Sequence, residues 1–135
     1  MLWLFVRRAT LPFAAIVAIA LVLRAPLMTS EPLLSNDVYR YLWDGQALRS
    51  GVNPYAHAPH DPRINHPEIP TIYPPHAEAL FVLAPNLFTW RLVIVAFDLF
   101  ALFLLRGRPR VALAYATFPL LLFEGTWSGH VDAVA

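Results

Sequence analysis

The segment WRLVIVAFDLFALFLL, residues 90–105, decides the fold class, because it is apolar apart from Arg91 and Asp98. Its length approaches the roughly 20 residues that an α-helix needs to cross a bilayer. Three arginines follow at once in RGRPR, residues 106–110. Basic residues beside a span favour the cytoplasmic side. The segment therefore predicts a transmembrane helix whose C-terminal end faces the cytoplasm.

Two further apolar segments extend this prediction to three spans. The first covers about residues 9–28 after Arg7 and Arg8, and the third is VALAYATFPLLLFEGTW, residues 111–127. The arginines place the N-terminus in the cytoplasm, so the second span runs inward and the third returns. A cleaved signal peptide is the alternative for the first segment, but RAPLMTS lacks the small-x-small cleavage pattern.

Composition agrees with an all-α integral membrane protein. Hydrophobic residues make up 58% of the 135 positions, charged residues only 14%, and mean hydropathy is +0.52. Soluble domains carry about 25% charged residues. The net charge of +1 does not indicate nucleic-acid binding, and the lack of cysteine excludes disulfides, thiolate zinc sites and cysteine nucleophiles. Three spans make a poor closed bundle, so we expect residues 1–135 to be the N-terminal part of a larger polytopic domain.

A long outer loop separates the first two predicted spans. It covers residues 29–75 and is rich in proline. HAEALFVLAPNLF, residues 76–88, is too short to cross and is interrupted by Pro85-Asn86, which indicates an interfacial helix. This topology places SNDVYRYLWDG, residues 35–45, and EGTWSGHVDA, residues 124–133, on the same outer side.

The charged residues of SNDVYRYLWDG lie on one face of a predicted helix over residues 36–50. At 100° per residue, Asp37, Arg40 and Asp44 fall within an arc of about 60°, with Tyr41 at its border. One interpretation is a solvated face, whose ion pairs contribute only about 0.2–0.5 kcal/mol each. The other interpretation is a binding or catalytic site that uses these charges.

Ionisable residues at the end of the third span favour the site. His130 and Asp132 are unfavourable at that depth unless they face a polar cavity. Asp98 is unfavourable at mid-span for the same reason, and Arg91, two turns away, is its expected partner. The H-x-x-H at His57 and His60 is a weak metal signal, and no metal is expected.

SNDVYRYLWDGQALRSGVNPY, TIYPPHAEALF and EGTWSGHVDA together resemble the bacterial GT-C membrane glycosyltransferases. The likeness is greatest to the polyprenyl-phosphate-mannose-dependent mannosyltransferases, and it extends from about residue 10 to the end. It implies a sugar donor on polyprenyl phosphate, a cell-envelope glycan or lipid acceptor, and inversion at the sugar. It also implies that Asp37 is the base, that no cofactor is used, and that more spans follow.

The chemistry of that reaction assigns expectations to other residues. An ionised Asp37 needs a nearby cation, for which Arg40 is the candidate, and the departing phosphate needs hydrogen-bond donors. Arg24, Arg49 and Arg63 are further candidates for the phosphate. The expected substrate- or phosphate-binding residues are Arg40, Asp44, Tyr41, Tyr73, His130 and Asp132. The alternatives are a transporter or flippase component, with Asp37, Asp98 and Asp132 along a path, and a non-catalytic membrane protein.

Overall fold

The computed structural model describes residues 11–32 and 34–134, and this part of the chain is helical, without strands. Arg7 and Arg8, which carried the prediction for the N-terminus, lie outside the described residues. The elements in order are α2 (Phe13–Arg24), η1 (Ala25–Met28), α3 (Asp37–Arg49), α4 (Pro75–Phe81), α5 (Leu87–Leu104), α6 (Pro109–Ala116), η2 (Leu121–Trp127) and η3 (Val131–Val134).

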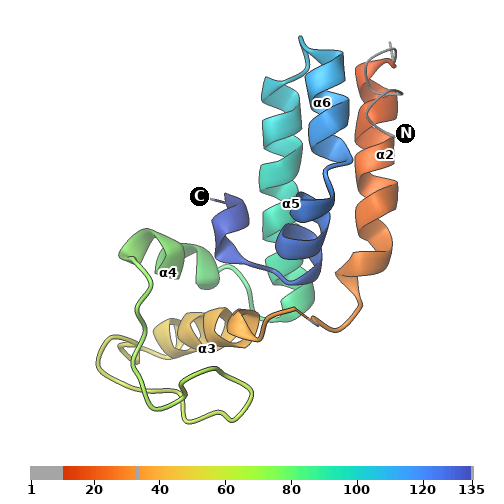
Figure 1. Ribbon diagram of the computed structural model, residues 1–135. Helices are drawn as coiled ribbons and strands as arrows, with labels where there is room; N and C mark the ends of the chain where they lie inside the picture. The colour runs from red at the N-terminus through yellow and green to blue at the C-terminus, as the bar shows by residue number, and fades with distance from the viewer. Residues whose placement is uncertain (1–10, 33, 135) are drawn as a thin grey trace.

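Helices α2, α5 and α6 lie side by side, and α3 crosses beyond one end of this group (Figure 1). Helix η2 continues from α6 back toward α3, and the connection between α5 and α6 lies at the opposite end. The loop between α3 and α4 extends away from the upright helices. This arrangement gathers the polar segments 35–45 and 124–132 near the N-terminal end of α5.

Helix α5 is long and apolar enough to cross a membrane, and within the described ranges no other helix meets both conditions. Its 18 residues extend about 27 Å at 1.5 Å per residue. It begins three residues before the predicted span 90–105, because the Asn86 side chain accepts a hydrogen bond from the backbone N–H of Thr89 at 2.9 Å. Helix α2 with η1, Phe13–Met28, is apolar but shorter.

The third predicted span, residues 111–127, is not one continuous helix. Helix α6 ends at Ala116, and η2, a π-helix, covers Leu121–Trp127. Pro119 explains the break, since proline lacks an N–H and its ring clashes with the carbonyl four residues earlier. The helix expected over residues 76–88 is likewise shorter, because α4 ends at Phe81 and a turn leads to Asn86.

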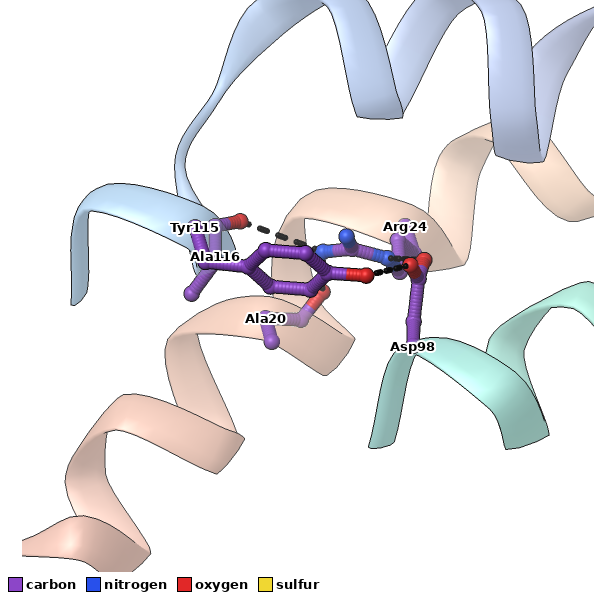
Figure 2. A network of polar contacts seen from close by, with 5 residues as sticks. All are labelled: Ala20, Arg24, Asp98, Tyr115 and Ala116. Atoms are coloured by element: carbon purple, nitrogen blue, oxygen red, sulfur yellow. Dashed lines mark hydrogen bonds and ion pairs between the residues drawn. The ribbon is translucent and has the colours of Figure 1, made fainter. Parts of the chain in front are cut away.

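A buried ion pair joins α2, α5 and α6 (Figure 2). Arg24 Nε donates to Asp98 Oδ2 at 2.8 Å, and the Tyr115 hydroxyl donates to Asp98 Oδ1 at 2.8 Å. The Arg24 guanidinium also donates to the carbonyls of Ala20 and Ala116. Arg24 therefore lies in the core, where it is not available to a phosphate, and it takes the place of Arg91 as the partner of Asp98.

Arg91 instead connects η2 to the chain that leaves η1. Its guanidinium donates to the carbonyls of Met28 at 3.1 Å and Ser30 at 2.6 Å, and also to that of Trp127. The Trp127 indole N–H donates to the carbonyl of Glu31 at 2.7 Å. These bonds fix the path into α3, which carries Asp37.

Helix α3 packs against α4 through an aromatic core. Tyr41 stacks on Phe81 with ring centroids 4.7 Å apart, and Tyr73 and Trp90 meet Tyr41 edge-on. Gly45 permits the close approach of the two helices, because a Cβ atom there would lie 2.2 Å from the Phe81 carbonyl oxygen. Tyr41 is therefore a core residue.

Candidate functional site

Asp37 stands in the first turn of α3 with its carboxylate accessible. Its backbone N–H donates to Ser35 Oγ at 3.1 Å, which satisfies a donor at the helix start. Its side chain is 38% exposed, and Oδ1 accepts a hydrogen bond from Asn65 Nδ2 at 3.2 Å. The second oxygen, Oδ2, faces the segment that follows η2.

That segment brings His130 close to Asp37. His130 Nε2 lies 3.9 Å from Asp37 Oδ2, and His130 Nδ1 lies 3.2 Å from Glu124 Oε2. A cavity of about 260 Å³ borders this group, and it is lined by Leu120, Leu121, Glu124, Gly125, His130 and Asp132. Asp132 is exposed.

Gly129 determines how this segment lies. Its φ of 76° is in the left-handed region that side chains disfavour. Its carbonyl accepts a hydrogen bond from the buried Trp90 indole N–H at 2.6 Å. A Cβ atom at this position would lie 3.1 Å from Val38 Cγ2 and 3.2 Å from Trp90 Cδ1. The glycine therefore permits the segment before His130 to pack between α3 and α5.

Gly129→Ala should destabilise the protein by about 1–3 kcal/mol, the usual range for a strained backbone position. Thermal or denaturant unfolding measures the change. Gly51→Ala controls for backbone strain alone, because Gly51 has a φ of 77° but no atom near its Cβ position. Gly107→Ala should cause the smallest loss of stability, because Gly107 has no positive φ and no atom lies within 4 Å of its Cβ position. Equal losses at Gly51 and Gly129 would show that the packing contributes nothing.

Arg40 does not pair with Asp37 or Asp44, contrary to the expectation from helix spacing. Its guanidinium donates to the carbonyls of His66 and Ile69 at 2.8 Å each, and to that of Asn65 at 3.4 Å. It is largely buried and holds the loop over residues 65–69 against α3.

Arg40 and Asp37 line a second cavity, of about 150 Å³. The remaining lining residues are Asn65, His66, Ile69, Pro70, Ile72 and Tyr73. Tyr73 is thus at the cavity, whereas Tyr41 is only 3% exposed and does not line it. The loop that Arg40 holds forms one wall of this cavity.

Asp44 lies two turns along α3 from Asp37, next to α4. It is fully buried beside Glu78, and Thr71 Oγ1 donates to Glu78 Oε1 at 2.8 Å. Within the described residues, both Asp44 oxygens and Glu78 Oε2 lack a hydrogen-bond partner. Burial raises the pKa of Asp44, and burial together with the Asp44 charge raises the pKa of Glu78 to about 7. A proton shared by Asp44 and Glu78 would give their buried oxygens a hydrogen bond and leave only one negative charge on the pair.

This pair predicts a pH-dependent stability. Because the pKa of Glu78 rises from 4.5 to about 7 on folding, the folded state binds more protons between these values. Stability should therefore fall as pH increases from about 4.5 through about 7. Glu78→Gln should remove this part of the slope in thermal unfolding across that range. Glu68→Gln, at an exposed carboxylate, is the control; an unchanged slope in Glu78→Gln would contradict the assignment.

The other candidate arginines are distributed over different contacts. Arg49 donates to the Val82 carbonyl at the end of α4, at 2.8 Å. Arg63 pairs with Asp61 at 2.8 Å and is 67% exposed. Across residues 11–32 and 34–134, no cluster of three His, Asp or Glu side chains could hold a metal ion.

Sequence reasoning missed two residues of this region. Glu78 lies in a short helix whose apolar neighbours gave no sign that it faces Asp44. Glu124 begins the segment EGTWSGHVDA but was given no role, because its contact with His130 depends on the π-helical turn between them. A carboxylate six residues before a histidine is not a periodicity that an α-helix would bring together.

Comparison with known proteins gives one match. The family model described as alpha-(1->6)-mannopyranosyltransferase, N-terminal domain (MptA_B family), matches residues 1–71. No curated protein and no solved structure matches the chain. The matched part contains Asp37, whereas Glu124 and His130 follow it. Since the match covers more than half of the 135 residues, the chain belongs to this alpha-(1->6)-mannopyranosyltransferase family.

Proposed function

We propose that this chain forms part of a membrane glycosyltransferase that moves a mannosyl group from a polyprenyl-phosphate donor to an acceptor hydroxyl. Asp37 is the base. The observation that carries the proposal is the accessible Asp37 carboxylate, which lines one cavity, with His130 of a distant segment, which lines another, 3.9 Å away. Membership of a mannosyltransferase family supports the sugar.

The reaction needs one ionised carboxylate near the acceptor. The acceptor oxygen forms a bond to the anomeric carbon as its O–H proton passes to Asp37. The bond from that carbon to the phosphate oxygen breaks, and the electron pair leaves with the phosphate. A single displacement inverts the anomeric carbon, so a β-linked donor gives an α-linked product. A positioned base contributes about 10²–10⁴-fold to such a step.

The cavity beside Asp37 has a cation for the departing phosphate. Arg40 lines it, and Tyr73 offers an aromatic ring to a sugar. Arg63, on the exposed loop, is the more accessible guanidinium. Hydrogen-bond donors directed at the developing charge stabilise the transition state. We assign the donor phosphate to the cavity that Arg40 and Tyr73 line, and the acceptor hydroxyl to Asp37.

The arrangement along α5 supports a site on the extracytoplasmic side of a membrane. Trp90, in the first turn of α5, contacts Gly129 of the site segment. Arg106, Arg108 and Arg110 follow the other end of α5 and are exposed. If these arginines face the cytoplasm, the site faces outward.

The transporter alternative has less support. Asp98 is 1% exposed, and both its oxygens are hydrogen-bonded to Arg24 and Tyr115. It therefore does not line a path with Asp37 and Asp132. A carboxylate that stabilises helix packing accounts for its position.

A donor comparison tests the proposal. Membranes containing the full-length protein are incubated with an oligomannoside acceptor and either polyprenyl-phosphate mannose or a nucleotide-activated mannose. We expect α-linked product from the polyprenyl-phosphate donor alone. Product from the nucleotide donor, in membranes without polyprenyl phosphate, would contradict the donor assignment. Absence of transfer from both donors would contradict the activity.

A further inference from the structure

Glu124 is joined to His130 by both backbone and side chain. The His130 backbone N–H donates to the Glu124 carbonyl at 3.0 Å, and His130 Nδ1 lies 3.2 Å from Glu124 Oε2. Glu124 stands in the π-helix η2, and π-helical turns occur frequently at functional sites. The irregular turn brings this carboxylate and the imidazole together.

The contact determines what each ring nitrogen of His130 does. A carboxylate is an acceptor, so it selects the tautomer whose Nδ1 carries the proton. Nε2 then has a free lone pair. This Nε2 atom is buried, lacks a hydrogen-bond partner among the described residues, and lies 3.9 Å from Asp37 Oδ2.

The other groups around His130 do not compete for this lone pair. Asp132 lines the same cavity as Glu124 but is exposed to solvent. Arg40 is bound to the loop carbonyls, so it does not neutralise Asp37 through a direct ion pair. Asn65 occupies the other oxygen of Asp37. The imidazole is thus the neighbour available to Asp37 Oδ2.

We propose that Glu124 and His130 form a proton relay behind Asp37; this rests on the proposed role of Asp37 as the base. Glu124 is a positioning residue that fixes the Nδ1–H tautomer. His130 Nε2 receives the proton that Asp37 has taken from the acceptor hydroxyl.

The relay moves one proton from the acceptor hydroxyl to solvent in three transfers. The proton leaves the acceptor oxygen for Asp37 while that oxygen bonds to the sugar. It then passes from Asp37 to His130 Nε2, which gives an imidazolium stabilised by Glu124 and restores the Asp37 carboxylate. The imidazolium loses the proton to solvent through the cavity where Asp132 is exposed. The 3.9 Å separation is compatible with this transfer, because catalytic hydrogen bonds are often longer before substrate binds.

The test combines kinetics with chemical rescue in the full-length protein, with polyprenyl-phosphate mannose as donor. We expect His130→Ala to lower kcat by about 10²-fold with little change in KM, at the lower end of the effect of an acid or base. Added imidazole should restore part of kcat, which a purely structural loss would not allow. His76→Ala, at an exposed histidine away from the cavity, is the matched control and should not respond to imidazole.

A second measurement does not depend on activity. The ¹⁵N chemical shifts of His130 should show a protonated Nδ1 and a bare Nε2 in the wild type at neutral to mildly alkaline pH. Glu124→Leu removes the acceptor and should abolish this tautomer preference, as well as lower kcat. A protonated Nε2 with a bare Nδ1 in the wild type would overturn the relay.

The outcomes separate the relay from the proposed function. If Asp37→Asn is inactive while His130→Ala retains wild-type kcat, the relay is wrong and the base assignment stands. If both variants retain wild-type transfer, the base and the relay both fail. Loss of kcat in His130→Ala without any rescue, at wild-type levels of folded protein, also contradicts the relay.

Discussion

Asp37→Asn should lower mannosyl transfer by about 10²–10⁴-fold, the usual effect of losing a general base. Asparagine keeps the shape of the side chain, and its amide oxygen can still accept the hydrogen bond from Asn65. The amide does not accept the proton of the acceptor hydroxyl. Initial rates with polyprenyl-phosphate mannose, per amount of folded full-length protein, measure the loss, which should appear in kcat.

Asp61→Asn is the matched control for this variant. Asp61 carries the same carboxylate, but it lies in the loop after α3, pairs with Arg63 and does not line the cavity of Asp37. Its replacement should leave the rate within about twofold, as is usual for exposed pairs that contribute little. Normal turnover in Asp37→Asn would show that the charged face of α3 is a solvated surface and that Asp37 is not the base.

Asp98→Ala should destabilise the protein by about 3–5 kcal/mol, because it leaves the Arg24 guanidinium buried without its carboxylate. The Tyr115 hydroxyl loses its acceptor in the same variant. Denaturant or thermal unfolding in detergent measures the change. Tyr115→Phe, which removes one hydrogen bond to the charged group, should cost less, about 1.5–3 kcal/mol.

A double variant identifies the cause of that loss. Arg24→Met with Asp98→Leu replaces both charges by apolar side chains of similar size. It should recover much of the stability lost in Asp98→Ala, because a buried pair often contributes little beyond a well-packed apolar substitute. If the double variant is as unstable as Asp98→Ala, the loss comes from packing and not from an unpaired charge.

Local signals predicted the regular parts of this fold. The helix expected over residues 36–50 is α3, Asp37–Arg49, because Gly51 and the polar residues before Asp37 mark its ends. The apolar run at residues 90–105 is α5, with a start fixed by Asn86. The break at Pro119 was readable from the sequence, but apolar length was given more weight than the missing N–H of proline.

Long-range partners could not be predicted in the same way. Spacing along a helix made Arg91 the partner of Asp98 and Arg40 the partner of Asp37. The structure instead pairs Asp98 with Arg24, 74 residues away, and binds Arg40 to carbonyls of a loop. Arginine carries five donors, so backbone carbonyls compete with carboxylates for it. The approach of His130 to Asp37 followed from topology, whereas the contact with Glu124 depended on an irregular turn.

The ion pair between α2 and α5 has a consequence for how the chain is made. Arg24 leaves the ribosome 74 residues before Asp98, an interval of about 4–15 s at 5–20 residues per second. During that interval Arg24, the last residue of α2, has no carboxylate partner, and a charge buried without a partner is strongly unfavourable. We therefore expect α2 to pack stably only after α5 has been made, so that the two opposite charges are buried together.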